Sequence, residues 1–385
     1  MNEQRKDIIQ GSNINFLLGS GLSSPYLKTL GSIEALLTQL ENSDWAADKK
    51  KLVKASLYKC FFDGVISKNL NILSGDTAAK SILESYKDFL KIWNSILLRR
   101  KSTILSKEVN VFTTNVDIFL DKALEDLGLE YNDGFNGRFK PSFSLSNFKK
   151  SRFKKSLHYD NKAEIPVFNL LKLHGSLSWE IENDGIIFSS NLNRVKAIAD
   201  KPIGAGHILD VPSDTTLESL KVAAEGKSAD TSTEAFLSEY EKLLIVNPTK
   251  DKFKDTLFDQ TFYELLRIYS NELEKENTIL FVIGFSFADE HIREITLRAA
   301  NSNPTLLVNV LAYSSDAEKE IKSHFNISKI KNNNIKFIPP PPEEADKGIP
   351  AVDKYNYTLP NVNKEYFGCL FKEEEESEMG EGPVS

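Results

Sequence analysis

Six short apolar runs constrain the fold of this chain more than any other feature of its sequence. They are rich in Val, Ile, Leu and Phe, and most end in a Gly, an Asn or a turn: Asn13–Gly19, Val109–Thr114, Val167–His174, Lys242–Val246, Thr278–Phe285 and Thr305–Ala312. Runs of this length and composition are typical of strands that are buried on both faces of a parallel sheet. We therefore expect these runs to form one buried parallel sheet.

Helical patterns lie between these runs. In Asp117–Leu127, for example, the apolar residues fall on one helical face, and similar patterns occupy 32–41, 251–275, 289–300 and 315–324. Strands that alternate with helices predict an α/β protein with helices on both faces of the sheet. The expected fold is a Rossmann-like, doubly wound parallel sheet with helical insertions, built from residues 1–330.

Two insertions and a tail stand outside this pattern. Residues 46–100 predict a helical insertion between the first two strands. Residues 180–240 are polar and interrupted by Gly and Pro, and we interpret them as a mobile excursion or a cap. Residues 331–370 contain four consecutive prolines and predict an extended C-terminal segment. Residues 371–385 form an acidic tail that we expect to be disordered.

Charge and cysteine content exclude several classes of protein. The 385 residues carry a net charge of −7, and six of the acids lie in the last thirteen residues, so the rest of the chain is close to neutral. A broadly basic protein that coats phosphate backbones is therefore excluded. Two cysteines cannot build a disulfide framework or a four-cysteine zinc site, and they suit a reducing compartment. No segment reads as a signal peptide or a membrane span, so we expect a cytoplasmic protein without membrane contact.

The first motif, Gly-Ser-Gly-Leu-Ser at 19–23, follows the first predicted strand. A glycine turn in this place lets backbone N–H groups approach a pyrophosphate, and the two serines add hydroxyl groups. The alternative is a tight turn that binds no ligand. Residue 24 is Ser, so the dehydrogenase fingerprint G-x-G-x-x-G is absent.

The second motif, Thr-Thr-Asn-Val-Asp at 113–117, ends the second predicted strand and opens a helix. Ligands of open α/β sheets bind at this edge, so Asn115 and Asp117 are candidate functional residues. The alternative is helix capping, because Asn and Asp side chains accept hydrogen bonds from free N–H groups at the start of a helix.

The third motif places His174 and a following glycine at the end of another predicted strand. Histidine titrates near neutral pH and can move protons in catalysis. The alternative is a buried, hydrogen-bonded histidine without a catalytic role.

The fourth motif, 284–291, is a second glycine turn at a strand end. Its backbone and the Ser286 hydroxyl could contact another part of the same ligand. In the alternative, Asp289 caps the following helix and His291 lies in its exposed first turn. All four motifs are expected at one edge of one sheet.

Taken in order, GSGLS at 19–23, TNVD at 114–117, LHG at 173–175 and GFS at 284–286 resemble the signatures of the sirtuin superfamily. More narrowly, the chain resembles the sirtuin-like domains of prokaryotic anti-phage defence systems. The resemblance covers roughly residues 10–315. It implies that NAD⁺ is the substrate, that the nicotinamide–ribose bond is broken, and that water yields nicotinamide and ADP-ribose.

The resemblance also implies roles for individual residues. Asn115 would hold the nicotinamide ribose and orient water, Asp117 would bind the carboxamide of nicotinamide, and His174 would accept a proton. The turn formed by Gly19, Ser20, Gly21 and Ser23 would bind the pyrophosphate, and Thr114 would lie beside the ribose. Gly284 and Ser286 would contact the adenosine, with Asp289 and His291 nearby.

The sequence departs from protein-deacylating sirtuins in three respects. Only Cys369 follows His174, so their four-cysteine zinc ribbon cannot be built. Residues 25–30 replace an Ile-Pro-x-Phe-Arg stretch, and Thr114 stands where the deacylases have Gln. We therefore expect NAD⁺ as a substrate, no zinc and no other cofactor. Such an enzyme must be held inactive until triggered, since NAD⁺ depletion stops the cell in abortive defence. No room remains for a large sensor domain after residue 330, which favours a homo-oligomer or a separate partner such as a HerA-type ATPase.

Three alternatives remain open at this point. The sheet could hold NAD⁺ or ADP-ribose as a sensor without chemistry, or the chain could be a deacylase. The run 148–155 mixes basic and aromatic residues and could bind nucleic acid, although we interpret it as a solvated loop over the active edge, so that direct nucleic-acid binding is not expected.

Overall fold

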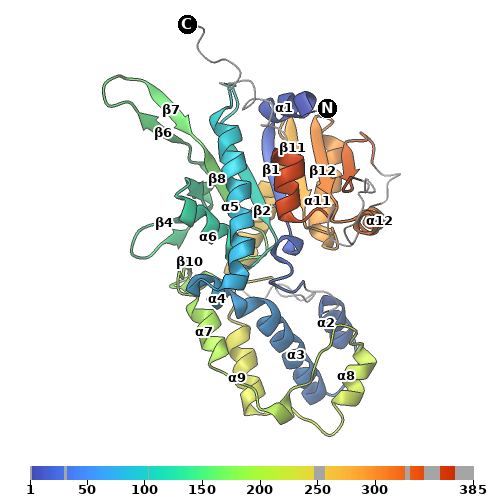
Figure 1. Cartoon of the computed structure of the whole chain (residues 1–385). Helices are drawn as coiled ribbons and strands as arrows, with labels where there is room; N and C mark the ends of the chain where they lie inside the picture. The colour runs from blue at the N-terminus through green and yellow to red at the C-terminus, as the bar shows by residue number, and fades with distance from the viewer. Residues whose placement is uncertain are drawn as a thin grey trace.

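A computed structural model describes residues 2–29, 33–102, 104–246, 256–325, 330–341 and 356–368. Its centre is a seven-stranded sheet in the order β13-β12-β11-β1-β2-β8-β3, and every pairing in it is parallel (Figure 1). The strands are β1 Asn13–Leu18, β2 Glu108–Thr113, β3 Tyr131–Asn132, β8 Val167–Lys172, β11 Thr278–Ile283, β12 Leu306–Leu311 and β13 Ile335–Ile338. The predicted α/β, Rossmann-like doubly wound fold is confirmed.

The strands alternate their side chains between two apolar layers. Phe16 and Leu18 of β1 pack into one core with helices α5 (Thr77–Leu98) and α6 (Phe119–Leu127), whereas Leu17 packs into a second core on the other face. That second face is covered by α10 (Thr256–Leu273) and α11 (Glu290–Ser302). Burial on both faces explains why the strands are continuous apolar runs rather than alternating ones.

The prediction of a strand at Lys242–Val246 is wrong. The segment forms a single antiparallel bridge, Gly175 to Ile245, outside the seven-stranded sheet. It follows directly after α9 (Thr231–Tyr240) and hydrogen-bonds to the loop after β8 instead of to a strand: Val246 N donates to His174 O at 2.9 Å. Its apolar side chains are buried against that loop, which accounts for the strand-like pattern.

The prediction of an extended segment at 331–370 is wrong at residues 359–367, which are helical. Residues 335–338 form β13 at the edge of the sheet, and residues 359–367 form a helical turn, α13 (Leu359–Asn361), followed by a π-helical turn, Val362–Phe367. The Phe367 ring is fully buried and lies 5.0 Å from Trp93 and 5.3 Å from Phe281. Burial of this apolar end stabilises the core on the α5 face. The acidic tail 371–385 lies outside the described residues.

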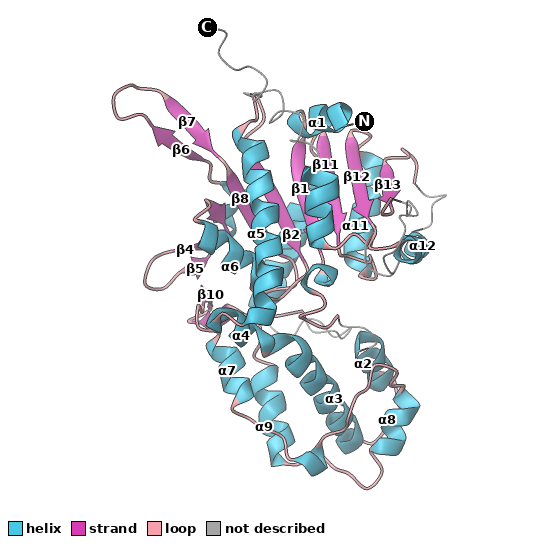
Figure 2. Cartoon of the chain, viewed as in Figure 1, coloured by secondary structure: helices cyan, strands magenta, loops and turns pink. Residues whose placement is uncertain are grey.

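A helical lobe lies beyond the carboxyl ends of the central strands (Figures 1 and 2). We use this name for the helices between residues 33 and 74 together with those between 193 and 240: α2 Ile33–Glu41, α3 Ala47–Phe61, the π-helical turn Phe62–Ile66, α4 Lys68–Ser74, α7 Asn193–Ala199, α8 Leu217–Ala223 and α9. The rings of Tyr58 in α3 and Tyr240 in α9 stack 4.3 Å apart and join the two insertions.

The polar stretch 180–240 contains helices because its Ser, Thr and Asp residues act as caps. Thr216 and Ser219 form a reciprocal capping box at the start of α8, and Asp230 and Thr233 form another at the start of α9. Such side chains satisfy the free N–H groups of a first helical turn. Ahead of them, β9 (Trp179–Glu182) and β10 (Gly185–Phe188) pair in a small sheet with β4 (Phe135–Asn136) and β5 (Ser142–Phe143).

The interpretation of 148–155 as a loop over the active edge is wrong. Residues 152–155 form β6 (Arg152–Lys155), which pairs with β7 (Lys162–Ile165) in a hairpin that leads into the amino end of β8. The hairpin projects away from the helical lobe (Figure 1). None of the helices in the described part of the chain is both long enough and apolar enough to cross a membrane.

Candidate functional site

A pocket lies where the carboxyl ends of β1, β2 and β8 face the helical lobe. Its empty space, counted with its open mouth, is about 530 Å³. It is lined by Ser20, Ser23, Leu27, Lys28, Phe61, Val65, Thr114, Asn115, Val116, Asp117, His174, Ile245 and Val246. The sheet thus supplies the polar groups, and the lobe supplies apolar ones, among them Val65 of the π-helical turn. π-Helical turns recur at functional sites.

The order of the strands explains why the pocket lies at this edge. Chain order runs outward from β1 in both directions, through β2 and β8 on one side and through β11 and β12 on the other. Open α/β sheets bind ligands at the carboxyl edge where the strand order reverses. The turn after β1 is therefore the natural start of a binding site.

The two glycine turns pack directly against each other. A Cβ atom at Gly19 would lie 2.4 Å from Gly284 O, and one at Gly284 would lie 2.8 Å from the Leu22 side chain. Gly284 also has φ = +66°, in the left-handed region that favours glycine. Gly19 N donates to Ile283 O at 3.0 Å and Gly21 N donates to Gly284 O at 3.0 Å. The N–H groups of both glycines are thus bonded within the protein.

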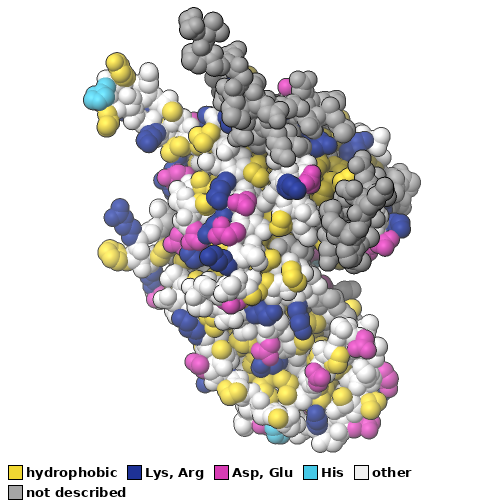
Figure 3. Space-filling model, in the orientation of Figure 1, with side chains coloured by type: hydrophobic (Ala, Val, Ile, Leu, Met, Phe, Trp, Pro, Cys, Tyr) yellow, Lys and Arg dark blue, Asp and Glu magenta, His cyan; other side chains and the backbone are white. Residues whose placement is uncertain are grey.

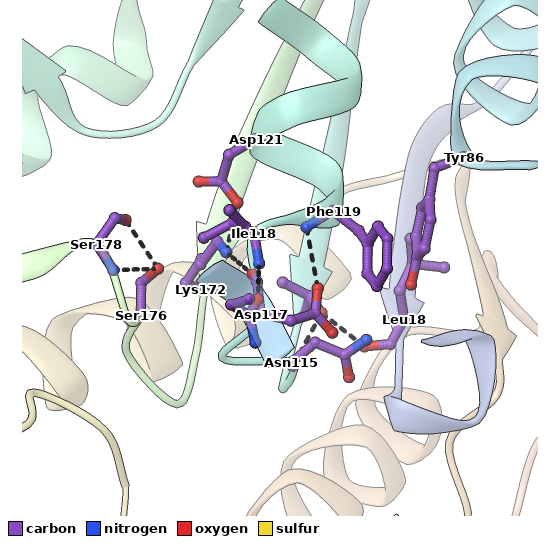
Figure 4. Close-up of polar contacts among 12 residues, drawn as sticks. Leu18, Tyr86, Asn115, Asp117, Ile118, Phe119, Asp121, Lys172, Ser176 and Ser178 are labelled. Carbon is purple, nitrogen blue, oxygen red and sulfur yellow. Dashed lines mark hydrogen bonds and ion pairs between the residues drawn. The ribbon is translucent and has the colours of Figure 1, made fainter. Parts of the chain in front are cut away.

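Ser23 and Asp117 belong to one buried hydrogen-bond network with Tyr86 of α5 (Figure 4). Ser23 Oγ donates to Asp117 Oδ2 at 2.8 Å and lies 3.0 Å from Tyr86 Oη. Burial raises the pKa of the Tyr86 hydroxyl, and the negative charge of Asp117 raises it further. Tyr86 therefore stays protonated and can bridge α5 to the end of β1.

Asp117 combines a capping role with a charge at the pocket wall. Its Oδ1 accepts a hydrogen bond from Phe119 N at 3.1 Å, so part of the capping interpretation holds, although the residue that directly precedes α6 is Ile118. Burial raises the pKa of the Asp117 carboxyl, and the positive charge of Lys172 opposes that rise. A carboxyl with a raised pKa in a pocket is typical of functional sites.

Asn115 presents an unpaired buried oxygen. Its Nδ2 donates to Gly19 O at 3.1 Å and its backbone N donates to Thr113 Oγ1 at 3.0 Å, which fixes the side chain between β1 and β2. Its Oδ1 is buried and has no hydrogen-bond partner among the described residues. A buried amide oxygen without a partner costs free energy, so a ligand donor such as a sugar hydroxyl would relieve it.

His174 lies on the other side of the same pocket. Its Nε2 is 3.0 Å from Asp289 Oδ2, an ion-pair distance without the alignment of a hydrogen bond. Asp289 Oδ1 accepts from His291 N at 3.0 Å and from Ile292 N at 3.2 Å, so the capping alternative for Asp289 is confirmed. The same carboxylate therefore both caps α11 and faces the histidine.

The remaining candidates of the fourth motif lie away from the pocket. Ser286 and His291 are exposed, and neither lines it, nor does Gly284. Ser286 Oγ accepts from Ala288 N at 3.3 Å, which is a local turn contact. Thr114, by contrast, lines the pocket beside Asn115. The structure thus brings the first three motifs to the pocket, and from the fourth motif only Asp289 adjoins it, through its contact with His174 and without lining the pocket.

Three residues of the site were not anticipated from the sequence. Tyr86 lies in a helix whose pattern gives no sign of a polar role. Lys172 is 3% exposed and pairs with Asp121 Oδ2 at 2.6 Å while donating to the Asp117 carbonyl (Figure 4). A lysine inside the apolar run 167–174 was the signal that could have revealed it. Lys28 lines the pocket from the loop after the first turn.

The arrangement offers hydrogen bonding, charge and one titratable ring within a single pocket. Within the described residues no group of three His, Cys, Asp or Glu side chains is placed to hold a metal ion. A comparison with models of known protein families gives no match, and a comparison with curated proteins gives none either.

Proposed function

We propose that the chain hydrolyses NAD⁺ at the nicotinamide–ribose bond and releases nicotinamide, ADP-ribose and a proton. One observation carries this proposal: Asn115 and His174, about sixty residues apart in the sequence, line one pocket at the carboxyl edge of the sheet. The resemblance of the four motifs to sirtuin-like domains gives the reaction its identity. The seven-stranded parallel sheet is a fold that suits a dinucleotide.

The residues of the pocket match what the reaction needs. Nicotinamide leaves as a neutral ring, so the site must stabilise a positively charged, oxocarbenium-like ribose rather than protonate the leaving group. The unpaired Oδ1 of Asn115 would accept a ribose hydroxyl, and Asp117 would bind the carboxamide of nicotinamide. His174 would take the proton of the attacking water, and the Asp289 carboxylate beside it would stabilise the protonated ring.

Water is the proposed nucleophile because the sequence lacks the zinc ribbon of protein deacylases. Ile245 and Val246 lie against the His174 loop and close the pocket on that side with apolar groups. Uncontrolled turnover would deplete NAD⁺, so we propose that homo-oligomerisation or a partner such as a HerA-type ATPase controls activity in anti-phage defence.

The proposal is tested by incubating the purified full chain with NAD⁺, alone and with its neighbouring gene product, and measuring nicotinamide by chromatography. Nicotinamide and ADP-ribose should appear in equal amounts. Asn115→Ala and His174→Ala should lower the rate by at least about 100-fold, the range usual for groups that act in proton transfer or charge stabilisation. Ser81→Ala, at an exposed position of α5 and outside the pocket lining, is the matched control and should keep the wild-type rate.

Two results would contradict the proposal. Tight binding of NAD⁺ without any release of nicotinamide, in every mixture tested, would favour the sensor alternative. Undiminished release by both Asn115→Ala and His174→Ala would remove this pocket as the catalytic site.

A further inference from the structure

The β6–β7 hairpin carries an excess of positive charge on a chain that is acidic overall. Its residues 150–165 include five exposed cations and two acids, a formal balance of +3, whereas the whole chain has a net charge of −7. A local excess of one charge sign attracts ligands of the opposite sign. The cations are Lys150, Arg152, Lys154, Lys155 and Lys162, and the acids are Asp160 and Glu164.

Two of the lysines oppose each other across the hairpin. Lys155 in β6 pairs in register with Lys162 in β7, and like charges directly opposite each other on antiparallel strands are destabilising. Lys155 Nζ lies 3.0 Å from Asp160 Oδ1, but both side chains are so exposed that water screens this pair. No carboxylate of the described residues lies within ion-pair distance of Lys162 or Lys154. An anion bound to the hairpin would relieve the repulsion.

Exposed aromatic rings accompany the cations at two places. Phe153 is 59% exposed, and Phe139, in the turn between β4 and β5, is fully exposed. Each ring is the middle residue of the same triplet, Arg-Phe-Lys, at 152–154 and at 138–140. The hairpin and the turn project on the same side of the molecule, and both show basic and hydrophobic side chains at the surface (Figures 1 and 3). A ring beside a cation can stack on a base while the cation contacts a phosphate.

We propose that the β6–β7 hairpin and the 138–140 turn bind single-stranded nucleic acid, with their basic side chains on its phosphates and their phenylalanine rings stacked on its bases. This role goes beyond the hydrolase function and does not depend on it. Direct nucleic-acid binding was not expected from the sequence because 148–155 was placed over the active edge. The hairpin instead leads into the amino end of β8, whereas His174 follows the carboxyl end of that strand.

The register of the hairpin places a ring and two cations on one face. Because side chains alternate along a strand, Phe153 and Lys155 lie on the same face, and Lys162 joins them from the opposite strand. Glu164 lies opposite Phe153 and is half-buried, so this face keeps a positive balance. It therefore offers stacking and charge together, which is the combination that holds single strands.

Two other partners share only part of this chemistry. An acidic protein segment, such as residues 373–378 of this chain, would attract the lysines but offers no flat ring to Phe139 or Phe153. Duplex nucleic acid has the phosphates, but its bases are stacked on one another and must be unstacked at a cost before a ring can enter. A single strand presents phosphates and free base faces at once, so it fits this surface best.

The test measures binding of a fluorescein-labelled oligothymidylate of about 12 nucleotides to the full chain, by fluorescence anisotropy at several salt concentrations. Affinity should fall as salt rises, because the bound cations displace counter-ions from the phosphates. Lys154→Gln/Lys162→Gln should reduce the slope of log K against log salt by about 1.4, the value for two phosphate contacts on a single strand. Lys91→Gln/Lys319→Gln, at exposed positions of α5 and α12 (Ser315–His324), is the matched control and should keep the wild-type slope.

A second set of variants tests the stacking. Phe153→Ala should weaken oligothymidylate binding on the order of tenfold, and Phe153→Trp should retain it. An abasic oligonucleotide of the same length has phosphates without bases, so Phe153→Ala should bind it as the wild type does. Tyr263→Ala, at an exposed ring of α10, is the matched control and should bind oligothymidylate with wild-type affinity.

Four results would overturn the proposal. The first is a wild-type chain that does not bind oligothymidylate at any salt concentration tested, and the second is equal wild-type affinity for the normal and the abasic oligonucleotide. The third is tighter binding of a duplex of the same length, or competition by hexaglutamate as effective as that by unlabelled oligothymidylate. The fourth is a wild-type salt slope in Lys154→Gln/Lys162→Gln. None of these measurements depends on nicotinamide release, so the hydrolase proposal and this one are overturned by different results.

Discussion

The buried pair between Lys172 and Asp121 allows a quantitative test of how the site is held together. Lys172 is 3% exposed, the Asp121 side chain is 17% exposed, and Nζ lies 2.6 Å from Oδ2. Lys172→Met keeps the length of the side chain but leaves the Asp121 carboxylate unpaired and the Asp117 carbonyl without its donor. Removal of one partner from a buried pair costs about 3–5 kcal/mol of unfolding free energy.

Urea denaturation is the assay. A loss of about 4 kcal/mol with a urea m-value of about 3–4 kcal/mol/M lowers the unfolding midpoint by roughly 1 M. The double variant Lys172→Met/Asp121→Leu removes both charges, so it should recover most of that loss, since an apolar pair of similar volume is often as stable as a buried ion pair. A midpoint shift of Lys172→Met below about 0.2 M, or no recovery in the double variant, would refute the reasoning.

Three further predictions concern packing and pH. Gly19→Ala should lower the thermal unfolding temperature sharply, since its Cβ would lie 2.4 Å from a backbone oxygen of the neighbouring turn. Gly206→Ala, with open space around the residue, should leave that temperature unchanged. Equal unfolding temperatures for the two variants would contradict the packing of the two glycine turns against each other. Phe367→Ala should lower the free energy of unfolding in urea denaturation by about 3–5 kcal/mol, because the ring is fully buried. Leu98→Ala, at a side chain that is 52% exposed, should lower it far less. A small effect of Phe367→Ala would mean that the C-terminal turn does not dock. Burial raises the pKa of the Asp133 carboxyl to about 6. The folded state therefore binds more protons than the unfolded state between about pH 4 and that value. The free energy of unfolding should fall by up to about 3 kcal/mol as pH rises through this window. Asp133→Asn should lack that decline, and an identical urea-midpoint profile from pH 4 to 7 in both proteins would contradict the assignment.

The fold could be predicted from sequence because its strands are buried on both faces. Such strands give continuous apolar runs, and five of the six runs are strands of the central sheet. The sixth, 242–246, has the same composition because a loop can bury apolar residues as fully as a strand does. Apolar composition indicates burial but not backbone pairing. Strand β13 was missed because it is a short edge strand within a polar stretch and gives no long apolar run.

Site residues that directly follow a strand could be predicted from the sequence, whereas those contributed by helices and loops could not. Asn115 and His174 follow β2 and β8 directly, so the topology of a parallel sheet places them at one edge. Tyr86 and Lys28 come from a helix and a loop: Tyr86 contacts Ser23 of the pocket wall, and Lys28 lines the pocket. The glycine turns could not be assigned from sequence because close backbone packing and phosphate binding demand the same residue.

The most direct test of the central claim is a crystal structure of the full-length His174→Ala variant, soaked with NAD⁺. The account predicts intact dinucleotide with its nicotinamide ribose between Asn115 and residue 174, close to Asp117. Dinucleotide bound at another edge of the sheet, or a nicotinamide ring in a cavity that Asn115 does not line, would contradict the account.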